Sequence, residues 1–212
     1  MKSSMALRGS AIVFATAILV SAGAAVASAA DEPYGDGDVD VTVDITEVLE
    51  PGVLALTLQG SSSALTESGS DALTRQFVGS LPTVTVTDTR TAEEVEPGAS
   101  WYVLGTATDF LGGAGQDTIP AANLGWAPRL TGTTDGEGLV FAGEAVEGSE
   151  DGGPGLADRE LLFSAVDSEV VAPEGEWSAT ADLLLRTDAD VTPGSYSSTL
   201  TLSLFESVEP TP

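Results

Sequence analysis

The chain has 212 residues, with 33 Asp and Glu against 7 Lys and Arg, no His and no Cys, and a formal net charge of −26 at pH 7. The missing residue types exclude His-based catalytic triads, thiolate nucleophiles, disulfides and ordinary zinc sites. The negative charge repels phosphate backbones and anionic head groups within a Debye length of about 8 Å, which excludes nucleic acid and simple membrane adhesion as partners.

Residues 1–30 have the features of a cleavable secretory signal peptide. Lys2 and Arg8 form the basic start, residues 11–20 form the apolar stretch, and the small residues of an Ala-x-Ala cleavage site follow. The alternative is an uncleaved membrane anchor, but the apolar stretch is shorter than the ~20 residues that a spanning helix needs. We therefore expect residues 31–212 to be a secreted protein, extracellular or associated with the cell wall, with no membrane insertion after cleavage.

Cleavage removes Lys2 and Arg8, which leaves five Arg against 33 carboxylates and a net charge of −28. A chain of this size can bury about 70% of its unfolded surface without disulfides, and the lack of Cys in an exported protein fits a Gram-positive cell surface. The acidity has two explanations. It serves solubility or a salty habitat, or its carboxylates are screened and bridged by divalent cations.

An acidic N-terminal segment, residues 31–38, precedes the first predicted strand. Asp36, Asp38 and Asp40 stand at alternate positions, as carboxylates do in hard-cation sites, and are the candidate ligands for Ca²⁺. They lack the distal Glu and the Gly spacing of an EF-hand, so the alternative is a solvated acidic segment, and no other cofactor is expected. Residues 39–45 alternate Val or Ile with Asp or Thr, which predicts a half-buried strand.

Three further strands are predicted before the middle of the chain. Residues 54–58 place Leu at alternate positions after a Pro-Gly turn signal, and residues 60–70 follow as a polar loop rich in Ser and Gly. Residues 84–86 alternate Val with Thr, whose β-branching favours strands. Residues 101–110 carry bulky side chains on both faces, which predicts a central strand of a two-layer core.

The C-terminal half begins with residues 132–155, which are rich in Gly, Glu and Asp. This composition predicts a flexible acidic loop with one short apolar strand at residues 139–141. Residues 177–185 alternate as one long strand. After a second Pro-Gly turn, residues 196–204 form the last predicted strand, and residues 207–212 are a C-terminal tail.

Short alternating strands separated by Gly and Pro predict an all-β fold, and no stretch shows helical spacing for more than about two turns. The most fitting architecture is an antiparallel two-layer β-sandwich that follows the cleavable signal peptide. Residues 39–206 form one domain, because the 182 residues left after removal of residues 1–30 fit a single domain.

Three short motifs occur in order along this domain. Residues 86–90 read Val-Thr-Asp-Thr-Arg, residues 101–103 read Trp-Tyr-Val, and residues 196–204 form a Tyr-led strand of Ser, Thr and Leu. Together they resemble the WxL-type surface domain of Gram-positive bacteria. Val103 stands where that family has Leu, and Leu202 where it usually has Trp. The resemblance implies a secreted β-sandwich that associates non-covalently with the cell wall, beside a membrane-anchored companion protein.

Four residues are candidates for a ligand-binding or wall-binding site. Asp88 and Arg90 are two residues apart, so they lie on one face at a strand end and can form an ion pair. The alternative is that this pair only orders the loop towards Trp101. Trp101 is expected in the core, because a sandwich of this size needs large aromatic residues. Trp126 lies in a turn-rich stretch and is predicted to be the more exposed aromatic, suited to stacking on a sugar ring, or else a core plug under a loop.

Glu93, Glu94 and Glu96 raise the alternative of a glycosidase, which needs two carboxyls about 5 to 9.5 Å apart across a cleft. Their loop contains Pro and Gly without an aromatic cleft, so we expect no enzyme activity. The sequence predicts a non-catalytic surface protein that binds peptidoglycan or another cell-wall polymer, or assembles with other surface proteins. The alternative is a structural or adhesive protein-interaction subunit without wall affinity.

Overall fold

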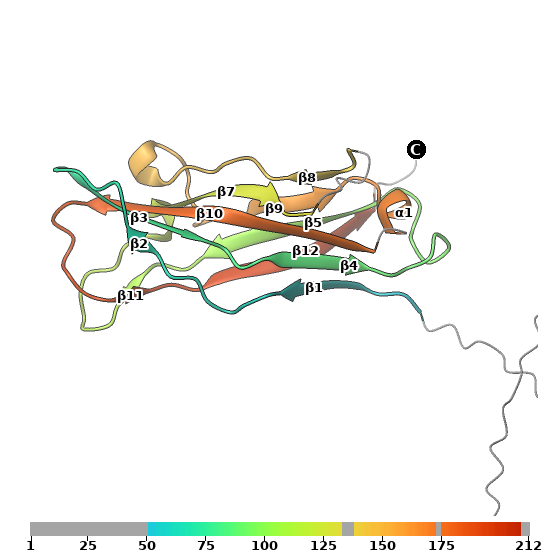
Figure 1. The fold of residues 1–212 in the computed structure, drawn as a ribbon, viewed down its shortest axis with the longest axis horizontal. Coiled ribbons are helices and arrows are strands. Elements are labelled where there is room, and N and C mark those ends of the chain that lie inside the picture. The colour runs from blue at the N-terminus through green and yellow to red at the C-terminus, as the bar shows by residue number, and fades with distance from the viewer. Residues whose placement is uncertain (1–50, 133–137, 173–174, 209–212) are drawn as a thin grey trace, which may run out of the picture. The chain divides into compact units, whose positions relative to one another are not determined.

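The computed structural model describes residues 51–132, 138–172 and 175–208 (Figure 1). Every strand pairing within these ranges is antiparallel. All but three of the described strands have 7 residues or fewer. The all-β prediction is therefore confirmed for the described part of the chain. Outside it lie the predicted signal peptide, the acidic N-terminal segment of residues 31–38, and the predicted strand at residues 39–45. The candidate cation ligands Asp36, Asp38 and Asp40 lie outside it as well.

The larger sheet has six strands. They are β1 Leu54–Leu58, β2 Thr66–Glu67, β3 Thr74–Ser80, β4 Val84–Asp88, β7 Leu124–Leu130 and β10 Glu176–Asp188. Their order is β1-β4-β10-β3-β2, and β7 pairs with the other edge of β10. With 13 residues, β10 is long enough to pair with β4 through its first part and with β3 through its second.

A second sheet has the order β12-β5-β9-β8. Its strands are β5 Ala99–Ala107, β8 Val140–Ala142, β9 Glu160–Ala165 and β12 Leu200–Val208. A separate ladder joins β6 Leu111–Gly112 to β11 Tyr196–Ser197. Because β5 lies between β12 and β9, the prediction of a central strand is confirmed within this sheet.

Helical structure is limited to single turns in the described ranges. The α-helix α1 covers Ser168–Val171, where the carboxylate of Asp167 caps the first turn by accepting from the backbone N–H of Val170 at 3.1 Å. Two 3₁₀ turns cover Ala121–Asn123 and Ser149–Asp151. Among the described helices, none has the length and apolar character needed to cross a membrane.

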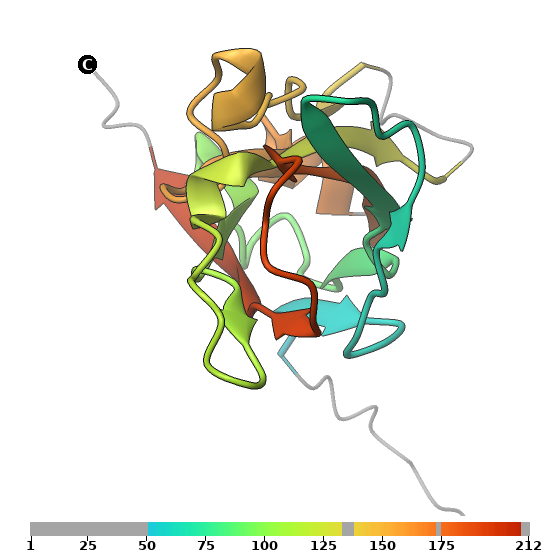
Figure 2. The same ribbon diagram turned by 90° about the vertical axis from the view of Figure 1, so that its left-hand side faces the viewer.

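Side chains from both larger sheets fill one interior. Alternate positions of β4 and β5 are buried, which accounts for the alternation in their sequences. The rings of Trp101 on β5 and Phe163 on β9 meet edge to face with centroids 5.3 Å apart, and both are fully buried. From β10, Trp177 and Ala179 belong to the same cluster. An end view shows the strands arranged around this interior (Figure 2).

The last strand differs from its prediction. Residues 196–204 were expected to form one strand, but β11 pairs with β6 and β12 pairs with β5. Between them, the hydroxyl of Ser198 donates to the carbonyl of Thr108, and the backbone N–H of Thr199 donates to the Thr108 hydroxyl at 3.0 Å. These side-chain bonds take the place of ladder bonds, so the strand is interrupted at residues 198 and 199.

The acidic segment that was predicted as a flexible loop, residues 132–155, is described at residue 132 and from residue 138 onward, and the latter part makes backbone contacts with its neighbours. Strand β8 confirms the short apolar strand within it, and Val146 exchanges two backbone hydrogen bonds of 2.9 Å with Trp126. A Cβ atom on Gly155 would overlap the carbonyl oxygen of Ala122. Gly148 and Gly155 thus permit close backbone contact with the 3₁₀ turn before β7.

Candidate functional site

Asp88, Arg90 and Glu206 form an ion-pair cluster where β4 ends. The Arg90 guanidinium donates from Nε to Asp88 Oδ1 and from Nη2 to Asp88 Oδ2, both at 2.8 Å. Its third nitrogen, Nη1, donates to Glu206 Oε1 on β12 at 2.6 Å. The predicted Asp88–Arg90 pair is therefore present, and it also joins the larger sheet to the second sheet.

The Arg90 guanidinium is mostly buried and is stabilised in its charged form. The Asp88 side chain is fully buried, and that of Arg90 is 11% exposed. Hydrogen bonds from Arg90 to Asp88, and secondarily to Glu206, raise the pKa of the guanidinium above its already high ordinary value. All three guanidinium nitrogens donate to carboxylates of the protein, and Arg90 lines neither of the cavities described below, so the geometry fits the alternative role in which the pair orders the loop.

The loop after Arg90 is ordered by Glu94. Its carboxylate accepts from the backbone N–H of Thr91 at 2.9 Å and from that of Gly52 at 3.2 Å. These bonds lower the pKa of Glu94 below its ordinary value of 4.5. The loop that raised the glycosidase alternative thus uses this carboxylate to hold the backbone that leads into β1.

Both candidate tryptophans are buried. Trp101 is fully buried, as expected for a core residue, and Trp126 is 2% exposed. The prediction of an exposed Trp126 is wrong, because the residue pairs with β10 inside β7 and its ring lies against Gly105, where an added Cβ would be 2.6 Å away. The alternative of a core plug describes it correctly. Neither ring offers a face to a sugar.

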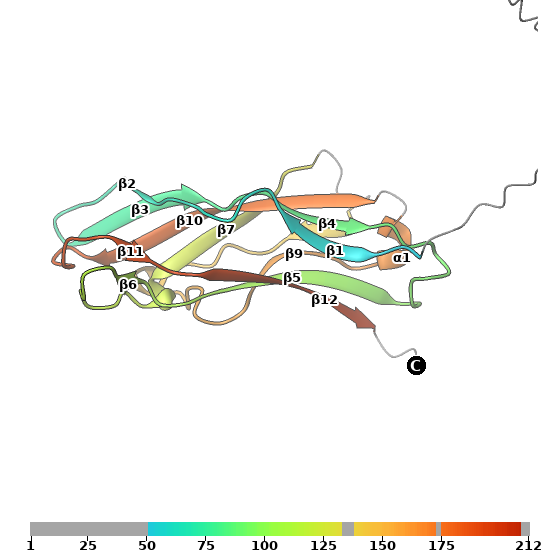
Figure 3. The same cartoon turned by 90° about the horizontal axis from the view of Figure 1, so that it is seen from below.

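Two adjoining cavities open elsewhere, with volumes of about 620 and 310 Å³. We call them together the groove. One wall is formed by residues 58–65, from the end of β1 to β2, and the other by residues 191–202, which include β11 and the start of β12. Seen from below, β1 and β12 run beside each other and lead into these two walls (Figure 3). Residues lining both cavities are Ser63, Leu65, Phe110 and Ser198.

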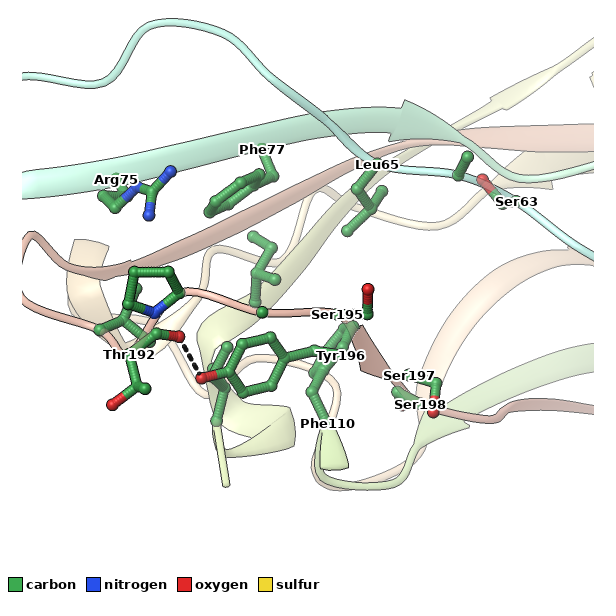
Figure 4. Close-up of a pocket in the computed structure, with 16 residues that line it drawn as sticks. Ser63, Leu65, Arg75, Phe77, Phe110, Thr192, Ser195, Tyr196, Ser197 and Ser198 are labelled. Atoms are coloured by element: carbon green, nitrogen blue, oxygen red, sulfur yellow. Dashed lines mark hydrogen bonds between the residues drawn. The ribbon is translucent and has the colours of Figure 1, made fainter. Parts of the chain in front are cut away.

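Hydroxyl groups and apolar side chains line the groove, as the close-up of the larger cavity shows (Figure 4). Serines lie on both walls: Ser61, Ser62, Ser63, Ser195, Ser197 and Ser198. Arg75 is the one charged residue among the lining side chains, and it pairs with Glu67 at 2.7 Å. The Tyr196 hydroxyl donates to the carbonyl of Thr192 at 2.6 Å, which holds the turn behind the wall in place.

The first wall also carries backbone N–H donors that have no acceptor within the described protein. Within the described ranges, the backbone N–H groups of residues 60–65 donate to no protein acceptor. Most of these residues are exposed, so water satisfies the donors in the free protein. An extended ligand lying along this wall could accept from the same groups.

Sequence reasoning did not find the groove. Its walls fall in stretches predicted as a polar loop and as the last strand. A signal was present, however, because residues 51–66 and 191–205 contain no Asp or Glu in a chain that has 33 of them. Two acid-free, serine-containing stretches in an acidic protein mark surfaces whose chemistry differs from the rest.

No group of carboxylates suited to a metal ion occurs among residues 51–132, 138–172 and 175–208. The calcium candidates Asp36, Asp38 and Asp40 lie outside this part of the chain. Asp151, from the acidic segment, pairs instead with Arg186 of β10. Calcium binding at the N-terminal carboxylates stays a prediction.

Comparison with protein-family models and with curated proteins gives no match for the chain. The resemblance to WxL-type domains therefore stays a prediction that is based on the three motifs.

Proposed function

We propose that the chain is a secreted, non-catalytic surface protein, a two-layer β-sandwich after removal of residues 1–30, that associates with the cell wall or assembles with other surface proteins through the groove. The features that support the sandwich are two antiparallel sheets that contribute to one core. The order of the three motifs and the signal-like N-terminus support the cell-surface location.

The observation that carries this proposal is the lining of the groove. A mature chain with 33 carboxylates and five Arg would be expected to expose carboxylates in any surface hollow, yet none lines this one. Each carboxylate placed there would repel an anionic ligand or leave a charge poorly hydrated against the apolar floor. The acid-free lining is what a binding surface on this protein requires.

The shape of the groove favours an extended ligand. Hydroxyls stand on both walls, apolar side chains lie between them, and backbone donors run along one wall. A glycan strand of the wall and an extended polypeptide both present alternating polar and apolar groups to such a surface. The second candidate, a protein-interaction subunit without wall affinity, uses the same groove and is favoured by the backbone donors of residues 60–65.

Sedimentation with isolated cell walls tests the proposal. Ser62→Glu adds one negative charge to the wall of residues 58–65, and Ser195→Glu adds one to the wall of residues 191–202. Both serines are exposed, and neither side chain forms a hydrogen bond with the described part of the protein. Thr131→Glu adds the same charge at an exposed residue directly after β7, outside the groove lining. We expect each groove variant to weaken binding about fivefold and the control to bind as the parent does.

The outcomes separate the two candidates. Equal binding by all four proteins would exclude the groove as the contact. If the parent stays in the supernatant at every salt concentration, wall association is excluded and the protein-interaction candidate is preferred. Far-UV circular dichroism of each variant provides the control for folding.

A further inference from the structure

We infer that the occupant of the groove is residues 39–45 of a second copy of this chain, bound as an added β-strand, so that copies join in a head-to-tail chain. This inference depends on the proposed function only in taking the groove as the contact surface. It names the partner as the protein itself, and it requires no affinity for the wall.

Unpaired strand edges favour a polypeptide over other extended ligands. Among the described strands, β1 pairs only with β4, and β12 pairs only with β5. The free edges of β1 and β12 face each other (Figure 3) and lead into the groove. Beyond β1, the free N–H groups of residues 60–65 continue this edge. Backbone donors and acceptors of an incoming strand are their natural partners.

The side-chain pattern of residues 39–45 matches the lining. Val39, Val41, Val43 and Ile45 recur at every second position, so a strand presents them on one face. That face suits the apolar floor made by residues such as Leu65, Phe110 and Leu202. Asp40 and Asp44 fall on the opposite face. Because no carboxylate lines the groove, these two negative charges meet less repulsion there than they would on most of this protein's surface.

The position of β1 favours a second copy over the chain's own segment. The groove begins past the end of β1, whereas the chain leads into the strand at its other end (Figure 1). Residues 46–50 reach at most about 18 Å, and five strand residues alone span about 16 Å. Residues 39–45 of the same chain would therefore reach the groove only if residues 46–50 were fully extended back along β1. The same residues of a second copy do not have this constraint.

Such a contact is heterologous, because a segment of one copy meets the groove of the next. The groove of the first copy and the segment of the second stay free, so assembly continues into an open chain and does not stop at a dimer. The charge of −28 opposes assembly at low salt. We therefore expect oligomers to grow with protein concentration and to be favoured by ionic strength.

Sedimentation velocity of the mature chain, residues 31–212, tests this in 0.5 M sodium chloride over a hundredfold range of concentration. Val41→Asp places a carboxylate on the apolar face of the segment, and Thr42→Asp adds the same charge one residue away on the other face. We expect the parent and Thr42→Asp to form oligomers, and Val41→Asp to lower the association constant at least about tenfold.

A mixing experiment identifies the direction of assembly. Val41→Asp keeps a free groove but lacks a competent segment, whereas the double variant Ser62→Glu and Ser195→Glu keeps the segment but has a blocked groove. Each alone should be monomeric, and their mixture should give one-to-one dimers that grow no further. Dimers in the mixture support the proposal even if the parent shows no wall binding.

Three results would overturn it. A monomeric parent at all concentrations excludes assembly between copies. A monomeric parent whose melting temperature is lowered by Val41→Asp and not by Thr42→Asp would mean that residues 39–45 bind the groove of their own chain instead. Equal oligomerisation of all variants would place the contact elsewhere, whereas failure of the wall experiment alone leaves the strand exchange intact.

Discussion

Arg90 holds the fully buried carboxylate of Asp88 through two hydrogen bonds of 2.8 Å, from Nε and Nη2, across a spacing of two residues. The pair is formed by neighbours in sequence, but Glu206, which completes it at 2.6 Å, lies 116 residues away. A local ion pair thereby becomes a connection between the last residue of β4 and the last strand of the domain.

The first prediction concerns this connection. Arg90→Ala leaves the Asp88 charge buried without its partner, and such losses cost about 3 to 5 kcal/mol of unfolding free energy. The control is Arg75→Ala, which removes the more exposed pair with Glu67 and should cost far less, because solvent screens that pair. Urea denaturation monitored by tryptophan fluorescence measures both. Similar losses for the two variants would contradict the structural role of the cluster.

The second prediction concerns acid. Because backbone hydrogen bonds from Thr91 and Gly52 lower the folded-state pKa of Glu94 below 4.5, its stabilising effect is complete above that pH and is lost as the pH falls through the lowered value. Glu94→Gln should therefore flatten the fall in unfolding free energy between neutral pH and about pH 3. Glu93→Gln removes the same charge from an exposed neighbour and serves as the control. Parallel pH profiles for the two variants would refute the assignment.

The third prediction concerns two glycines of the acidic segment, both with positive φ. Gly152→Ala introduces a Cβ with no atom within 4 Å, so it should cost only the left-handed backbone penalty of about 1 to 2 kcal/mol. Gly155→Ala carries the same penalty and also forces a Cβ into the Ala122 carbonyl oxygen. Thermal unfolding should show a clearly larger loss for Gly155→Ala, and equal losses would mean that the segment does not pack as described.

The fourth prediction concerns divalent cations. With residues 1–30 removed, the charge of −28 would repel anionic wall polymers over about a Debye length, and Ca²⁺ could bridge carboxylates on both sides. Wall binding should therefore be stronger in millimolar calcium than in EDTA at the same ionic strength. Replacing Asp36, Asp38 and Asp40 by Asn should reduce the difference. Equal binding in calcium and EDTA would exclude bridging by calcium and favour the explanation that the negative charge serves solubility.

Sequence reasoning succeeded where the information is local. The alternation in residues 54–58, 84–86 and 177–185 predicted β1, β4 and β10, because one side of each strand faces the core. The ion pair of Asp88 and Arg90 was predictable for the same reason, since two residues of spacing place both side chains on one face.

The strands that were not predicted depend on distant partners. β7 contains Gly125 and Pro128, which argue against a strand. It pairs with β10 along one edge, and its other edge carries only the isolated bridge from Trp126 to Val146 in place of a second strand, so the missing N–H of Pro128 is tolerated. β9 has a continuous apolar run, Leu161 to Phe163, and pairs with β5 across a register shift, so no alternation appears. Glu206 and the groove were not predictable because their parts are more than 100 residues apart.

The place of β12 in the second sheet has a consequence for when the protein can fold. Each of its pairs with β5 joins residues separated by roughly 90 to 110 positions, from Leu200 with Ala107 to Val208 with Ala99. Of the described strands, β12 is the last along the chain, and it completes the second sheet and supplies Glu206 to Arg90. A chain that lacks β12 keeps one side of β5 uncovered, and contacts this distant in sequence form slowly. Completion of the second sheet therefore waits until β12 has been synthesised.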